Sequence, residues 1–315
     1  MKDRSCICRR MSACESGEDF QRAPVRHNIP MSPGESEITH VSDTALMVAA
    51  CRAAETELGD GFVHDPFAAR LAGERGKAIL NAMPYANVAR MGLSIRARFV
   101  DELLLEALET NSVATVLSVG CGLDTRPWRL ELPANLRWIE VDFADMLNYK
   151  ERLMSGEKMN CRRQRLVADV INPQQRREIY EAAGPDPALI ITEGLLMYLP
   201  AATVHALASE IAHETRIAQW ISDITTTGFR KALGGGTDTM SPIRHVQAAD
   251  ALQGEEILQV LQRHGWTTAA RRSYITDVEF AQERVRRMMG GKAPPPPSFP
   301  PGDPTGVHRF STIRE

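Results

Sequence analysis

The sequence has few of the features that mark secreted, membrane or disulfide-stabilised proteins. It contains six cysteines, at positions 6, 8, 14, 51, 121 and 161, and their scattered spacing fits neither a zinc site nor a disulfide framework. No apolar run approaches the roughly 18 residues that a membrane-spanning helix requires. No apolar segment follows the charged N-terminus, as it would in a secretory signal. We therefore expect free thiols, no metal site, no membrane partner and a cytoplasmic location.

A strong excess of either charge is also absent. The 37 Lys and Arg residues are nearly matched by 40 Asp and Glu residues, for a formal net charge of −3. This balance provides no general attraction to a polyanion, so we expect no nucleic-acid partner. The hydrophobic content of 43% over 315 residues is ordinary for a globular protein with a substantial core.

Composition divides the chain into an N-terminal tail and one expected domain. Residues 1–38 are rich in Ser, Gly, Pro and Arg without a sustained period, which predicts disorder; Met11 and Met31 also make an upstream extension of the reading frame conceivable. We expect residues 39–315 to form a single domain with four parts. These parts are an all-helical cover (39–112), a ligand-binding sheet (113–224), a Thr- and Gly-rich lid (225–250) and a C-terminal part of the sheet (251–315).

Short apolar runs alternate with amphipathic stretches through most of this domain. Such alternation predicts an α/β fold with a doubly wound, mostly parallel, seven-stranded Rossmann-like sheet. Helices are expected between strands, notably at 144–154 and 203–213, and in the cover at 42–52, 67–72 and 95–108. Strands are expected at 115–119, 136–142, 164–169, 188–193, 217–224, 266–275 and 306–313.

The most informative stretch is residues 116–126, Val-Leu-Ser-Val-Gly-Cys-Gly-Leu-Asp-Thr-Arg. It indicates a buried strand that ends in a turn at Gly120 and Gly122, where a ligand can approach a backbone without Cβ atoms. Asp142 lies 22 positions after Gly120, where an acidic residue can accept both hydroxyl hydrogens of a ribose. Thr125 stands where a dinucleotide site has its third glycine. A nucleoside without a pyrophosphate, S-adenosylmethionine (SAM), is therefore favoured over NAD, although an NAD-dependent oxidoreductase stays open.

Several blocks taken together resemble the leucine carboxyl methyltransferase family, over roughly residues 40–225. That family includes protein phosphatase methyltransferases and tetracenomycin-type polyketide O-methyltransferases. The resemblance implies a class I SAM-dependent methyltransferase fold with an N-terminal helical cover. The matching blocks are Gly120–Leu130, Glu140-Val-Asp-Phe143 with Lys150, Glu193–Leu199, His64-Asp-Pro-Phe67 and Arg96-x-Arg98.

The resemblance also assigns roles to individual residues. Tyr198 becomes a candidate substrate contact, with packing at a helix start as an equal alternative. Asp142 and Asp169 are also open to a simpler role as loop caps, and Arg52 matches a basic family position only loosely. The implied cofactor site is Arg96 at the methionine carboxylate, Gly120 and Gly122 along the methionine, Asp142 at the ribose, Asp169 with Val170 at the adenine, and Glu193 near the amino group.

No Ser-His-Asp or Cys-His constellation is visible, and this bears on the acceptor. A carboxylate is already ionised at neutral pH and needs no general base, whereas a phenol, with a reference pKa of about 10, would benefit from one. We therefore expect a SAM-dependent O-methyltransferase acting on the carboxylate of a small molecule, such as a polyketide-like or other secondary metabolite. The alternatives are a methyltransferase of a protein or peptide C-terminus and a non-catalytic SAM-binding regulator.

Overall fold

The computed structural model describes residues 38, 40–83, 86–110, 113–232, 243, 246–288, 291 and 299–312. The disorder expected for the N-terminal tail concerns residues outside this part of the chain, apart from residue 38. Nearly half of the lid expected at 225–250 also lies outside it, because residues 233–242, 244 and 245 are not described. Within the described part, no helix is both long and apolar enough to cross a membrane.

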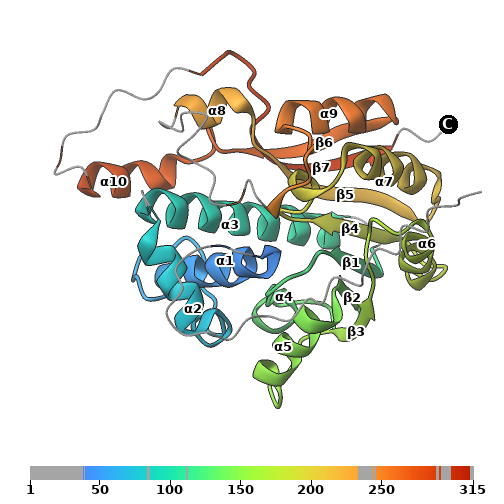
Figure 1. Ribbon diagram of the computed structural model, residues 1–315, viewed down its shortest axis with the longest axis horizontal. Coiled ribbons are helices and arrows are strands. Elements are labelled where there is room, and N and C mark those ends of the chain that lie inside the picture. Colours follow the sequence, from blue (N-terminus) through green and yellow to red (C-terminus); the bar gives the residue numbers. More distant parts are fainter. Residues whose placement is uncertain are drawn as a thin grey trace, which may run out of the picture.

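Seven strands form one sheet in the order β3-β2-β1-β4-β5-β7-β6 (Figure 1). The first five strands in this order run parallel, and β7 pairs antiparallel with both β5 and β6. The prediction of a doubly wound, mostly parallel seven-stranded sheet is confirmed. The strands are β1 (Thr115–Val119), β2 (Arg137–Asp142), β3 (Arg162–Val167), β4 (Ala188–Thr192), β5 (Ile217–Ile224), β6 (Trp266–Ser273) and β7 (Gly306–Thr312).

The two central strands explain why helices cover both faces of the sheet. Every residue of β1 and β4 is buried, as expected for parallel strands that read as continuous apolar runs. Alternate residues face opposite layers, so Leu117 packs among residues of α6, α7 and α9, while Val116 packs against α3. The helices in these layers are α6 (Pro173–Ala182), α7 (Ala201–His213), α9 (Gly254–Arg263) and α3 (Ala86–Thr110).

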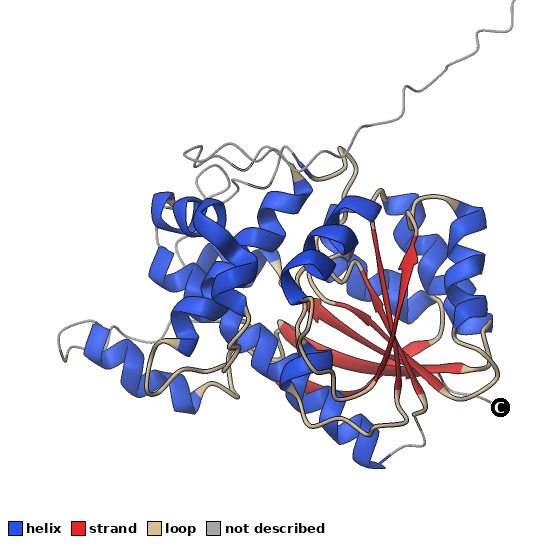
Figure 2. Ribbon diagram, turned by 90° about the horizontal axis from the view of Figure 1, so that it is seen from below, coloured by secondary structure: helices blue, strands red, loops and turns tan. Residues whose placement is uncertain are grey.

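The N-terminal cover consists of three helices beside the sheet (Figure 2). They are longer than the sequence predicts, because the span between residues 72 and 95, expected to be loose, is mostly helical. Gly73, at φ +56°, kinks α2 without ending it. A buried ion pair with two short contacts, 2.7 and 2.8 Å, joins Arg75 of α2 to Asp43 of α1. The three helices are α1 (Val41–Thr56), α2 (Ala68–Ala82) and α3.

The remaining helices are short and lie mainly near the carboxyl ends of the strands or in connections. The expected helix at 144–154 is confirmed as α5, whereas α10 was not expected from the sequence. The strand expected at 164–169 is β3, and it begins two residues earlier. These helices are α4 (Arg126–Arg129), α5 (Ala144–Met154), the 3₁₀ turn η1 (Leu196–Tyr198), α8 (Thr227–Ala232) and α10 (Glu279–Met288).

Candidate active site

A cavity of about 1380 Å³ lies where the carboxyl ends of β1, β4 and β5 meet the helical cover. This is the edge at which open α/β sheets bind ligands. The cavity also receives residues from α1, α3, α8 and the segment after β6. The sequence-predicted residues that line it are Arg96, Gly120, Gly122, Glu193 and Tyr198.

The glycine turn after β1 forms part of the cavity wall. Gly120 and Gly122 have φ values of +63° and +44°, a region that residues with a Cβ rarely adopt. A Cβ on Gly120 would lie 2.8 Å from the Leu195 side chain, and one on Gly122 would lie 3.3 Å from Cβ of Ala45 in the cover. The turn therefore needs glycine for its backbone conformation and for close packing.

Asp142 stands directly behind this turn, at the end of β2. Its carboxylate accepts hydrogen bonds from the backbone N–H groups of Gly122, at 2.7 Å, and Phe143, at 2.8 Å. Burial raises the pKa of Asp142 above its usual value, although both amide donors act in the opposite direction. Each carboxylate oxygen has further acceptor capacity. Asp142 therefore supports the turn and can still accept ribose hydroxyls, although it is not among the residues that line the cavity.

Asp169 and Val170 lie in the loop after β3, also outside the cavity lining. Oδ1 of Asp169 accepts from the backbone N–H of Ile171 at 2.9 Å, and the Val170 carbonyl accepts from Arg176 at 3.0 Å. The loop-capping role that the sequence left open for Asp169 is thus present. The predicted adenine contact stays a prediction.

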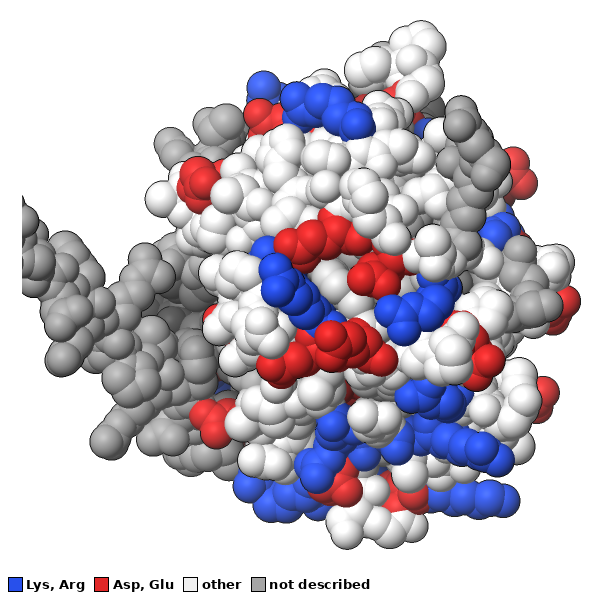
Figure 3. All heavy atoms as spheres, turned by 90° about the vertical axis from the view of Figure 1, so that its right-hand side faces the viewer, with Lys and Arg blue, Asp and Glu red and all other residues white. Residues whose placement is uncertain are grey.

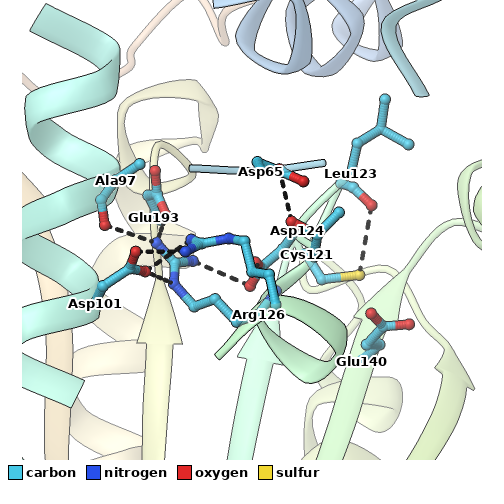
Figure 4. Close-up of polar contacts among 12 residues, drawn as sticks. Asp65, Ala97, Asp101, Cys121, Leu123, Asp124, Arg126, Glu140 and Glu193 are labelled. Atoms are coloured by element: carbon cyan, nitrogen blue, oxygen red, sulfur yellow. Dashed lines mark hydrogen bonds and ion pairs between the residues drawn. The ribbon is translucent and has the colours of Figure 1, made fainter. Parts of the chain in front are cut away.

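A network of charged side chains crosses the floor of the cavity. Glu193 accepts from Arg96 at 3.0 Å and from Arg126 at 2.8 Å. Arg126 also pairs with Asp101 at 2.6 Å and Asp124 at 3.0 Å, as the close-up shows (Figure 4). Burial alone would raise the pKa of Glu193, but Arg126 and Arg96 lower it below its usual value. The Glu193 side chain is therefore a carboxylate at neutral pH.

Two further residues extend the network and give it its net charge. Arg96 lies 3.5 Å from Asp223, at the end of β5, and Arg129 pairs with Asp101 at 2.6 Å. The three arginines face four carboxylates, so the network carries one net negative charge. SAM has a sulfonium, an ammonium and a carboxylate, and therefore one net positive charge. Arg96 suits its carboxylate and Glu193 its ammonium, so the donor set fits this cofactor.

Buried ion pairs hold the glycine turn from behind. Lys150 is fully buried and donates to Glu140 at 2.7 Å and to the carbonyl of Asp124 at 3.0 Å. On the opposite side, Arg52 pairs with Asp65 at 2.8 Å and donates to the carbonyl of Leu123 at 2.6 Å. Arg52, the loosely matched family position, thus braces the turn while lining the cavity.

Tyr198 lies in η1, in the segment that follows β4. It lines the cavity, as does Thr44 of α1. Burial raises the pKa of Tyr198 above its usual value, so the hydroxyl stays protonated at neutral pH. The structure places Tyr198 where an acceptor could reach it, and the substrate contact stays a prediction.

Sequence reasoning missed two cavity residues, Asp223 and Tyr274. Asp223 accepts from the backbone N–H of Gly194 at 2.6 Å and orients the turn after β4. Its position near the carboxyl end of an expected strand was an available signal. Tyr274 follows β6, the outermost strand, and no local pattern links that position to the site.

The fold and this site define a class I methyltransferase-like α/β protein. The chain matches the sequence profile of the leucine carboxyl methyltransferase family over residues 45–212. Since this is more than half of the chain, the protein belongs to that family.

Individual relatives agree with this assignment. A relative from Frankia alni, named for S-adenosyl-L-methionine-dependent methyl transfer, is 34% identical over 190 residues, or 56% of this chain and 66% of that protein. A Mycobacteroides abscessus relative with the same type of name is 30% identical over 233 residues, or 70% of this chain and 71% of that protein. The match thus spans about two thirds of the length of these relatives.

A solved structure from Streptomyces avermitilis shares the fold. It is described as a duf574 family protein, superposes with a TM-score of 0.56 and is 10% identical in sequence. The match covers 86% of this chain and 97% of that one. At this identity the likeness concerns the architecture alone.

Proposed function

We propose that this chain is a SAM-dependent O-methyltransferase that converts the carboxylate of a small, largely apolar molecule into its methyl ester. The main support is one cavity that combines a charged floor with an apolar wall. Its volume of about 1380 Å³ exceeds the roughly 300–1,000 Å³ of typical ligand sites. There is therefore room for a cofactor and an acceptor together.

SAM is the cofactor, and when bound it supplies a methyl group on a sulfonium leaving group. Arg96 holds the methionine carboxylate and Glu193 the ammonium, while the glycine turn allows close approach of the backbone. The side chains around the acceptor exclude water and align its oxygen. A carboxylate acceptor is already ionised, so none of these residues has to remove a proton.

The apolar wall favours a small molecule over a peptide. Its residues come from the cover, from α8 and from the segment before α10, so they line the space from several sides. A concave, mostly apolar site of this kind is typical of small-molecule ligands. These wall residues include Met47, Met83, Met91, Phe229, Ile275 and Val278.

A protein or peptide C-terminus is the second candidate acceptor. Basic residues near the cavity, Arg230, Lys231 and Arg286, could attract an acidic chain that ends in a carboxylate. Arg286 is already paired with Glu283 at 2.7 Å, and Arg230 donates to Gln253. These pairs reduce the attraction, so we rank the small molecule first.

Methyl transfer from radiolabelled SAM tests both candidates. The acceptors are anthracene-2-carboxylic acid, its phenol counterpart 2-hydroxyanthracene, and a hexapeptide ending in leucine. We expect calorimetry to show micromolar binding of SAM and S-adenosylhomocysteine (SAH), and alkali-labile label on the anthracene acid, as expected for a methyl ester. Alkali-stable label on the phenol would contradict a carboxylate acceptor, and labelling of the peptide alone would favour the second candidate. Binding of NAD instead of SAM would contradict the cofactor.

A further inference from the structure

Tyr274 has an unsatisfied hydroxyl in the wall of the cavity. It directly follows β6, and its backbone N–H donates to the carbonyl of Thr305 at 3.3 Å. Its ring lines the cavity, whereas its hydroxyl oxygen is enclosed and has no hydrogen-bond partner. Of the enclosed polar side-chain atoms without a partner in the described part of the chain, this is the only hydroxyl that belongs to a cavity-lining residue.

Aromatic packing holds the Tyr274 ring in place. The ring stacks on Phe99 of α3, with centroids 5.8 Å apart and planes 10° from parallel. Phe229 of α8 lies against it at 6.0 Å and 45°. A ring held between two elements has little freedom to turn its hydroxyl towards another partner within the protein. The fixed position thus keeps an unsatisfied donor beside the cavity.

Tyr274 lines the same cavity as Asp223, Arg96 and Glu193 of the charged floor. Burial raises the pKa of Tyr274 well above its usual value, and the neighbouring charges of Asp223, Arg96 and Glu193 also act on it. The hydroxyl therefore stays protonated at any pH at which the protein would work, and it is a neutral donor. An unsatisfied buried donor destabilises the unliganded protein. A ligand oxygen that accepts from this hydroxyl would remove that cost.

We propose that the Tyr274 hydroxyl donates a hydrogen bond to the oxygen of the methyl acceptor, an assignment that rests on the proposed function. A neutral donor suits an anionic acceptor, because hydrogen bonds to charged groups are stronger than those between neutral groups. Because the hydroxyl is enclosed in the unliganded protein, a neighbouring side chain has to move before an acceptor can reach it, and the binding of SAM to Arg96 and Glu193 would supply such a movement. The acceptor therefore binds after the cofactor, and one carboxylate oxygen is held by Tyr274 while the other faces the methyl group.

The test compares Tyr274→Phe with Tyr180→Phe. Tyr180 is also buried, but it lies in α6, away from the cavity, and its hydroxyl bonds to Glu210 at 3.0 Å. Because Tyr274→Phe removes an unsatisfied group, the melting temperature of the unliganded variant should stay unchanged or rise by about 1–2 °C. Tyr180→Phe loses a real hydrogen bond, so its melting temperature should fall while its kinetics stay those of wild type.

The functional readout is the affinity of the SAH complex for anthracene-2-carboxylate, followed by the fluorescence of the probe, together with steady-state methyl transfer. Tyr274→Phe should weaken acid binding by about tenfold to a hundredfold, the cost of a lost hydrogen bond to a charged group, and should raise KM more than it lowers kcat. SAH affinity should stay within twofold of wild type. This combination is not expected from a merely structural role.

Three results would overturn the assignment in different ways. If wild type and Tyr274→Phe bound and methylated the anthracene acid equally well, the role of Tyr274 would be wrong, whereas the proposed function would not be affected. A parallel loss of SAH affinity would show that the hydroxyl serves the cofactor and not the acceptor. A wild-type protein that binds SAH but does not methylate anthracene-2-carboxylic acid would contradict the proposed function itself.

Discussion

In the unliganded protein, charged residues of the cavity floor form with one another the ion pairs that they would otherwise form with a zwitterionic ligand. Arg96 and Glu193 have side chains that are only 13% and 15% exposed, so each would be costly to bury alone. Their mutual hydrogen bond lowers that cost before a ligand arrives. In the proposed complex, the carboxylate and ammonium of SAM replace this contact with two similar ones, so little reorganisation of charge would be required.

We expect Arg96→Lys to weaken SAM binding by about tenfold or more, because lysine keeps the charge but lacks the planar fork that binds a carboxylate through two hydrogen bonds. The matched control is Arg98→Lys on the same helix, where Arg98 pairs with Glu102 at 2.8 Å on the outer face. Calorimetric titration of both variants with SAM and SAH checks the expectation. Equal affinities of the two variants would show that Arg96 is not a ligand of the carboxylate.

At the scale of elements, the glycine turn after β1 is held by contacts from other parts of the chain. Lys150 and Arg52 donate to two of its carbonyls, and Asp142 accepts from its Gly122 N–H. These contacts come from α5, α1 and β2, so three separate elements determine the shape of a single turn. Side chains placed on rigid elements position a binding loop more accurately than the loop could by itself.

Two glycine-to-alanine substitutions distinguish the two reasons for glycine in this turn, its backbone conformation and its close packing. Gly156 has a φ of +84°, and a Cβ added there would have no other atom within 4 Å, whereas Gly120 combines a φ of +63° with a 2.8 Å approach to Leu195. We expect Gly156→Ala to cost about 1 kcal/mol of backbone strain. Gly120→Ala should cost more and should also weaken SAM binding, because Leu195 lines the cavity. Urea unfolding and calorimetry measure the two effects.

If both variants lost the same stability and bound SAM like wild type, the contact with Leu195 would be unimportant, and only the backbone conformation would require glycine at position 120.

The elements also show what sequence reasoning can and cannot predict. The strands were predicted to within about two residues, because short apolar runs such as 188–192 are bounded by turn residues. The C-terminal end of α2 and the N-terminal end of α3 were missed, since Gly73 and many polar residues obscure the helical period there. Arg96, Gly120 and Glu193 were found from motifs. Tyr274 was not, because its approach to the site depends on the position of β6 in the sheet.

For the whole molecule, buried charges matter more for stability than the surface does. Figure 3 shows acidic and basic side chains interspersed over one face, in keeping with the net charge of −3. Exposed pairs such as Lys77–Glu74 and Arg286–Glu283 contribute little, typically about 0–1 kcal/mol each. The dependence of stability on pH should therefore arise mainly from titratable groups that are buried.

His308 is the clearest of these groups at mildly acidic pH. It lies in β7, where one ring nitrogen contacts the Pro304 carbonyl at 2.6 Å and the other the Thr268 hydroxyl at 3.0 Å. Burial lowers the pKa of His308 to about 4. The unfolded chain therefore takes up a proton near pH 6.5, whereas the folded protein does so only near pH 4.

Since the unfolded state binds more protons between these values, stability must fall as the pH drops from about 6.5 to about 4, by about 3 kcal/mol in total.

Burial also lowers the pKa of His264, but that histidine is only partly buried, so His264→Gln serves as the control. Asp124, whose pKa lies at about 2 through Arg126 and Lys150 despite its burial, loses its contribution only below about pH 4. Urea unfolding across pH 4–7.5 should thus show a slope that becomes much shallower in His308→Gln and changes little in His264→Gln. If the slope persists in both variants, another buried group governs this range and the role given to His308 is wrong.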